Sequence, residues 1–149
     1  MINETDYPHI TVAAIAERDG KFLFVREETE EGIVINQPAG HVEVGETILD
    51  AVVRETMEET AWKVEPLAFL GIDQYTSSIN GITYIRHAFV VKAIYECEDV
   101  VLDDGIIEAL WLSPEEAFKM ELRSPLVVHS VHSFLEGTHY PLTLFHHHI

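Results

Sequence analysis

The feature that most constrains the fold is one helical segment set among runs of strand-forming residues. Residues 47–61 predict a helix, because Thr47 can cap its first turn and Asp50 stands where a capping box has Glu. Ile, Val and Ala dominate residues 9–17, which predict a buried strand. A helix among strands indicates a layered α/β structure, since each element buries its apolar side against another layer.

Further strands are expected on both sides of this helix. Asn80-Gly81 is a strong two-residue hairpin signal, and Asp19-Gly20 is a second turn signal. The expected strands cover residues 21–26, 33–35, 66–75, 83–95 and 109–112, with a polar loop over 27–32. Two helices capped by serine are expected over residues 114–119 and 125–136, the second closed by Gly137. The pattern predicts a single domain over residues 1–149, with a core from about 8 to 143, of α/β class (α+β by some schemes).

The charge balance excludes some classes of function. Nine basic residues face 26 acidic ones, and a net charge of −17 repels a phosphate backbone, so no nucleic-acid partner is expected. Cys97 is the only cysteine, which fits a reducing cytoplasm, and no signal peptide or membrane span is expected. We therefore expect a soluble cytoplasmic protein with no membrane partner. The surplus of acid indicates either solubility or the binding of divalent cations.

Three carboxylates on the predicted helix favour cation binding. Glu55, Glu58 and Glu59 are spaced three and four residues apart, so they share one helix face. Like charges at this spacing destabilise a helix by a few tenths of a kcal/mol per pair, and a hard cation between them reverses that cost. Mg²⁺ takes such oxygen ligands and keeps waters for substrate phosphates, and Mn²⁺ is the expected substitute. An isolated pair of glutamates would instead be a solvated helix face.

The residues around these glutamates strengthen the prediction of a metal site. Arg54 lies four residues before Glu58 and can brace it with a charge-assisted hydrogen bond. Glu46 lies just before the helix and can support the cluster from that side. Gly40 allows close approach of the backbone, so its carbonyl is a candidate further ligand, and Pro38 stiffens the same loop.

The spacing of these residues resembles the Nudix box. Gly40, five residues, Glu46, seven residues and then Arg54-Glu55-Thr56-Met57-Glu58-Glu59 fill that pattern. Two positions depart from it: Thr56 replaces an aliphatic residue, and Ala61 replaces glycine. Thr56 should weaken packing of the helix underside, and Ala61 should disfavour a left-handed helix end by roughly 1–2 kcal/mol, so the helix is expected to end differently.

The resemblance extends to the flanking sequence, over about residues 8 to 143. Four segments carry it: residues 9–13, 36–41, 122–127 and 140–142. They resemble a branch of Nudix phosphatases, which implies an α/β/α sandwich with a central mixed β-sheet and a Mg²⁺-dependent enzyme. The substrates implied are small phosphorylated molecules: nucleoside di- and triphosphates, thiamine pyrophosphate and hydroxymethylpyrimidine pyrophosphate. The assembly is expected to be a monomer or a homodimer.

The resemblance also implies roles for individual residues. Glu55, Glu58 and Glu59 become metal ligands, and Arg54 orients the cluster. The catalytic base is expected to be Glu55, with Glu58 or a residue outside the box as alternatives. The mechanism expected is attack of a water on a phosphorus atom, with Mg²⁺ neutralising the anhydride oxygens.

Substrate contacts are expected from the loop and the strand beside the box. Asn36 and Gln37 can contact a base or sugar, or instead satisfy the loop backbone. Arg86, in an apolar strand, needs an anionic partner, which is either a substrate phosphate or a neighbouring carboxylate. Asp103 and Asp104 are assigned to a turn with Gly105, whereas Glu108 is a minor candidate for a later ligand or base.

Two other functions share the same box. One is a selective pyrophosphohydrolase of oxidised nucleotides or of ADP-ribose, which differs from the phosphatase in its products. The other is a non-catalytic nucleotide sensor on the same scaffold, since fold does not dictate function. The four glutamates at 46, 55, 58 and 59 favour catalysis over sensing.

Overall fold

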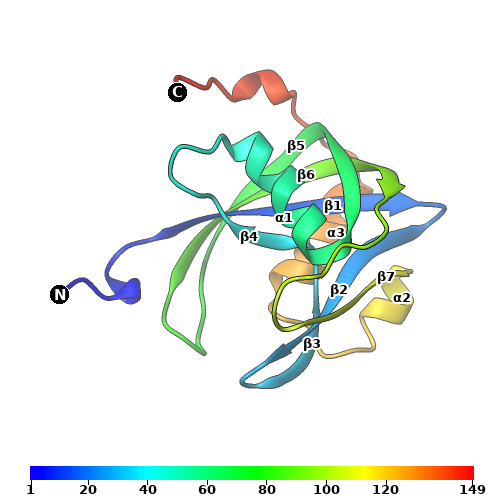
Figure 1. Ribbon diagram of the computed structural model, residues 1–149, viewed down its shortest axis with the longest axis horizontal. Coiled ribbons are helices and arrows are strands. Elements are labelled where there is room, and N and C mark those ends of the chain that lie inside the picture. Colours follow the sequence, from blue (N-terminus) through cyan, green and yellow to red (C-terminus); the bar gives the residue numbers. More distant parts are fainter.

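A central mixed β-sheet with helices on both faces organises the computed structural model, which describes residues 1–149 (Figure 1). The strands lie in the order β3 (Gly32–Asn36), β2 (Lys21–Thr29), β1 (His9–Arg18), β6 (Thr83–Glu96) and β5 (Trp62–Thr76). Two further strands join this sheet: β4 (Ala39–His41) pairs with β1, and β7 (Ile106–Leu112) pairs with β2. β1 and β6 run parallel and the other pairs run antiparallel. The predicted mixed sheet is therefore confirmed.

Both faces of the central strand β1 are apolar, and each is covered by a helix. Because successive strand residues point to opposite faces, Val12 packs with Val52 of α1 (Ile48–Thr60), whereas Ile15 packs with Val127 of α3 (Leu126–Glu136). The short helix α2 (Pro114–Ala117) adds Ala117 to the α3 side. Two apolar layers thus enclose the sheet, and the predicted α/β/α sandwich is confirmed. None of the helices has the length and apolar character that a membrane crossing needs.

The helices begin and end close to the predicted residues because local signals set their limits. The Thr47 hydroxyl accepts the Asp50 N–H at 3.0 Å, although the structure has no return bond from the Asp50 carboxylate. The Ser124 hydroxyl accepts the Leu126 N–H at 3.2 Å, and Gly137 closes α3 with φ of 83°. Capping by Thr47 is therefore confirmed, apart from the second half of the box at Asp50. The predicted cap of α3 by Ser124 is wrong, because α3 begins at Leu126 and Pro125, which has no side-chain cap bond, takes the N-cap position.

The strands are longer than predicted. β5 begins at Trp62 and contains Pro66, where the pairing with β6 shifts register; an edge strand tolerates proline at such a bulge. Residues 27–29 continue β2, so the loop expected over 27–32 is largely a hairpin. Three short elements were not predicted: β4 and two 3₁₀ helices, η1 (Glu4–Asp6) and η2 (Leu142–Leu144).

The helix α1 ends at Ala61 in the left-handed conformation, so the prediction of a different helix end is wrong. Ala61 has φ of 64° and ψ of 9°, and its N–H donates to the Met57 carbonyl at 2.9 Å. This bond satisfies one of the carbonyls that a helix end leaves unpaired, and the Ala61 side chain is buried. Thr56 is fully buried, and its hydroxyl donates to the Val52 carbonyl at 2.7 Å, so no polar atom is left without a partner in the core.

Candidate active site

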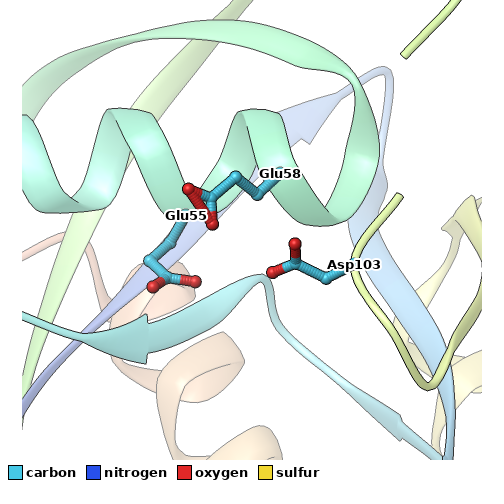
Figure 2. A group of neighbouring side chains, drawn as sticks. All are labelled: Glu55, Glu58 and Asp103. Carbon is cyan, nitrogen blue, oxygen red and sulfur yellow. The ribbon is translucent and has the colours of Figure 1, made fainter. Parts of the chain in front are cut away.

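The acidic face of α1 lies over β4 because the opposite face of the helix is buried in the sheet. Ala51, Val52 and Thr56 face the core, which turns Glu55, Glu58 and Glu59 toward the edge formed by β4. Figure 2 shows Glu55 directed toward the β4 ribbon, with Glu58 one turn further along the helix. The predicted grouping of these side chains on one helix face is therefore present.

Arg54 forms hydrogen bonds with several carboxylates of this acidic face. Its guanidinium binds Glu46 through two nitrogens, with Nε–Oε2 at 2.6 Å and Nη2–Oε1 at 2.9 Å. The same side chain donates to Glu55 at 2.8 Å and to Glu58 at 3.2 Å. A further bond to the His41 carbonyl, at 3.0 Å, attaches the helix to the end of β4. Such a bidentate, charge-assisted arrangement fixes both the arginine and the carboxylates that it contacts.

The strand β4 approaches two of the glutamates with its backbone. The Ala39 N–H donates to Glu59 Oε1 at 2.9 Å. Gly40 lies so close to Glu55 that a Cβ on residue 40 would be 2.1 Å from the Glu55 carboxyl carbon. A side chain at residue 40 would therefore displace the Glu55 carboxylate, whereas glycine lets the main chain approach it closely.

Asp103 joins the cluster from a loop that is distant in sequence. Carboxylate oxygens of Glu55, Glu58 and Asp103 all lie within 4.8 Å of one another, and Figure 2 shows the three groups converging. The Asp103 N–H donates to the Glu58 carbonyl at 3.0 Å, and this bond docks the loop on the last turn of α1. The predicted turn is present, since the Ile106 N–H donates to the Asp103 carbonyl at 3.1 Å. The sequence interpretation missed the second role of Asp103, for which only its acidity was a signal.

The charge of the cluster is only partly compensated. Burial, opposed by Arg54, raises the pKa of Glu55, and burial raises the pKa of Asp103 with a further contribution from Glu58. Burial raises the pKa of Glu59 to about 8. In contrast, the hydrogen bond from Arg54 lowers the pKa of Glu46. Several close carboxylates with one arginine between them are a set of hard oxygen donors that fits a divalent cation. The carboxylates that converge closely enough to hold one ion are Glu55, Glu58 and Asp103, whereas Glu59 is directed at the Ala39 N–H.

Gln37 and Arg86 lie inside the protein and bind each other. Arg86 is 5% exposed and donates to Gln37 Oε1 at 2.7 Å and to the Ser130 hydroxyl at 2.9 Å. Asp73 is its cross-strand neighbour on β5, and burial lowers the pKa of Arg86 to about 10. The bonded partners of Arg86 are thus neutral groups, and the neighbouring carboxylate predicted as one alternative to a substrate phosphate is not bonded to it. Asn36 differs, because it is half-buried and its side chain has no hydrogen-bond partner.

Glu108 lies outside the cluster. Its carboxylate pairs with Arg26 across β2 and β7, where the two residues are register partners. The later acidic residue that lies beside Glu55 and Glu58 is therefore Asp103, whereas the Glu108 carboxylate is paired with Arg26.

A family model described as NUDIX domain matches residues 7–131. Among characterised proteins, phosphatase NudJ of Escherichia coli K12 is 36% identical over 138 residues, which are 92% of this chain and 90% of that protein. NudJ of Shigella boydii shows the same identity and coverage. Among solved structures, a NUDIX hydrolase from Nitrosomonas europaea superposes with a TM-score of 0.90 and 38% identity, covering 95% of this chain and 98% of that one. The MutT protein of Methanosarcina mazei Go1 is more distant, with a TM-score of 0.67, 26% identity, and coverage of 88% and 96%.

Proposed function

The chain belongs to the Nudix family, and from this premise we propose that it is a Mg²⁺-dependent phosphatase of nucleoside di- and triphosphates and of thiamine-type pyrophosphates. Family membership and the similarity to NudJ make it a hydrolase acting on phosphoanhydride bonds. Among such hydrolases, we propose a phosphatase of broad specificity because the similarity to NudJ extends over nine-tenths of both chains. It includes the segment at residues 36–41. Thiamine pyrophosphate and hydroxymethylpyrimidine pyrophosphate are the thiamine-type substrates proposed.

The observation that carries the metal requirement is the group of carboxylates on α1 and Asp103 around one point. We assign Glu55, Glu58 and Glu59 as ligands, together with Asp103 and the Gly40 carbonyl. Mg²⁺ is the proposed ion and Mn²⁺ the substitute, since both take oxygen donors. When bound, the cation neutralises the anhydride oxygens and increases the acidity of a water.

The protein's own groups then position the substrate and move the proton. Glu55 faces Gly40 and is the proposed base, taking a proton from the attacking water, with Glu58 and Asp103 as the alternatives. Arg54 holds Glu55, Glu58 and Glu46 in place, which keeps the base aligned with the phosphorus atom. Asn36, whose side chain is free, is the proposed contact to the organic part of the substrate.

The test is a product assay with Mg²⁺ on five kinds of substrate: nucleoside diphosphates, nucleoside triphosphates, thiamine pyrophosphate, hydroxymethylpyrimidine pyrophosphate and ADP-ribose. Orthophosphate, pyrophosphate and mononucleotides are measured separately, for the wild type, Glu59→Gln and the control Glu65→Gln. Glu65 is exposed on β5 and lies outside the group of converging carboxylates. Release of orthophosphate from several substrates, lost only in Glu59→Gln, supports the proposal.

Other outcomes identify the competing functions. Pyrophosphate or mononucleotides released from a single substrate would replace the broad phosphatase with a selective pyrophosphohydrolase. Metal and nucleotide binding without turnover of any substrate would instead indicate a sensor on the same fold.

We also propose that the enzyme acts in the cytoplasm, as one domain, in monomeric or homodimeric form. The single cysteine supports a reducing compartment. The net charge of −17 supports small anionic substrates that bind together with a cation, and it argues against a nucleic-acid partner. Cell fractionation and light scattering test these points. Recovery with the membrane fraction, or a larger assembly, would contradict them.

A further inference from the structure

Arg86 is a buried cation without an ion pair. Its guanidinium donates no hydrogen bond to a carboxylate. The three acceptors are Gln37 Oε1, the Ser130 hydroxyl and, at 3.3 Å, the Leu126 carbonyl. Asp73 lies opposite Arg86 on β5, and its charge opposes the lowering of the Arg86 pKa by burial without forming a hydrogen bond. Burying a guanidinium whose hydrogen bonds all go to neutral groups is still costly, and an apolar side chain of similar volume would often serve stability as well. The position of Arg86 therefore calls for an explanation other than packing.

The partner that Arg86 holds most closely is the side chain of Gln37. Gln37 is 2% exposed, accepts from Arg86 at 2.7 Å and donates to the Val127 carbonyl of α3 at 2.9 Å. Both ends of its amide are thus fixed, one to β6 and the other to α3. The bond from the Ala14 N–H to the Pro38 carbonyl, at 2.9 Å, holds the next residue on β1.

The segment held in this way is the one that contacts the glutamates. Two residues after Gln37, the Ala39 N–H donates to Glu59, and Gly40 then lies against the Glu55 carboxylate. Proline at position 38 restricts the chain between the held side chain and these contacts. A displacement of Gln37 is therefore transmitted to both carboxylates over a distance of only a few bonds.

We propose that Arg86 and Gln37 are positioning residues, which hold the segment 37–40 so that Ala39 and Gly40 keep Glu59 and Glu55 in the geometry that binds the metal. Arg86 acts through Gln37, and the helix α3 is the fixed point to which both are attached. This inference rests on the proposed metal-dependent function, because it concerns the same carboxylates. It differs from a direct contact between Arg86 and a substrate phosphate, since it predicts effects in the absence of substrate.

The experiment measures Mn²⁺ affinity without substrate, by electron paramagnetic resonance, in Arg86→Met, Gln37→Met and the double variant. Each single substitution should weaken Mn²⁺ binding by roughly 10-fold, as removal of a group supporting a metal ligand commonly does. The double variant should bind Mn²⁺ no more weakly than the more affected single variant, because the two substitutions remove the same connection. Arg86→Lys should not restore affinity, since an ammonium lacks the planar fork that reaches Gln37 and α3 together.

A second readout is independent of metal. Hydrogen exchange of the Ala39 amide should be faster by roughly 10-fold or more in Gln37→Met, because the bond to Glu59 is no longer held. The matched control is Ser130→Ala, which leaves the Gln37 bond intact and leaves the Leu126 carbonyl as acceptor for the same nitrogen of Arg86. In this control, Mn²⁺ affinity and Ala39 exchange should stay within about 2-fold of wild type.

Three outcomes decide between the alternatives. Unchanged Mn²⁺ affinity and unchanged Ala39 exchange, with a raised KM in Arg86→Met, would overturn the proposal in favour of direct phosphate binding. If wild type binds no Mn²⁺, the metal-dependent function fails, whereas faster Ala39 exchange in Gln37→Met would still support the positioning of the segment. If Arg86→Met does not fold, Gln37→Met and Gln37→Asn test the same connection from its other end.

Discussion

Replacement of Glu59 by glutamine should stabilise the metal-free protein at alkaline pH while abolishing its metal binding. Burial is the largest cause that raises the pKa of Glu59 to about 8, from an ordinary value of 4.5. Glu27, Glu55 and Asp103 raise it further, and the hydrogen bond from Ala39 opposes them. Glutamine keeps a carbonyl oxygen for the Ala39 N–H and carries no charge, so Glu59→Gln removes the unfavourable ionisation and keeps the favourable bond.

The magnitude and its pH range follow from the pKa. Since the pKa of Glu59 is higher in the folded protein than in the unfolded chain, ionisation favours unfolding, and stability is lost as pH rises from 4.5 to about 8. One pKa unit is worth about 1.4 kcal/mol, so the largest possible loss is near 5 kcal/mol. Partial exposure of the carboxylate reduces this, and we expect Glu59→Gln to be more stable by about 2 kcal/mol above pH 8.

The assay is urea unfolding in EDTA at pH 5.5 and pH 8.5, both above the isoelectric point of about 4.7. At pH 5.5 the stabilisation should be about a third of its value at pH 8.5, and the exposed control Glu65→Gln should show no such trend. With excess Mn²⁺ the order should reverse, because only the wild type gains stability from a bound ion. Equal unfolding free energies for wild type and Glu59→Gln at both values of pH would refute the reasoning from burial.

Three further predictions concern the same site. Arg54→Lys keeps the charge but loses the two-nitrogen contact to Glu46, and kcat should fall by roughly 10- to 100-fold with little change in the circular dichroism spectrum; activity within 2-fold would contradict this. Asp103→Asn should weaken Mn²⁺ binding by about 10-fold without loss of thermal stability, and unchanged titration curves would remove Asp103 from the cluster. Ala61→Gly should change the unfolding free energy by less than about 1 kcal/mol, because two opposing effects offset each other. Glycine removes the strain of an alanine in the left-handed conformation, but it also removes a buried methyl group and raises the conformational entropy of the unfolded chain. A change above 2 kcal/mol in urea unfolding would show that one of these effects dominates.

The sequence alone determined what depends on neighbours along the chain. Thr47 begins α1 and the spacing of Glu55, Glu58 and Glu59 places them on one face, because helix geometry relates residues three and four apart. Runs of strand-forming residues likewise indicated most of the strands, although not β4. Ala61 shows the limit of such local reasoning: its intrinsic preference opposes the left-handed end, yet the bond to Met57 and the buried methyl group keep it there.

Only the tertiary structure decided which distant residues meet. Asp103 enters the cluster because its backbone docks on the end of α1, and no periodicity relates it to Glu58. Arg86 binds Gln37 because β1 lies between β6 and β4, which brings two segments 49 residues apart to one face of the sheet. The sequence contains these side chains and their charges, but their partners depend on the packing of β6 and α3. Such contacts depend on how the helices pack against the sheet, because this packing selects one among many possible pairings of the same polar groups.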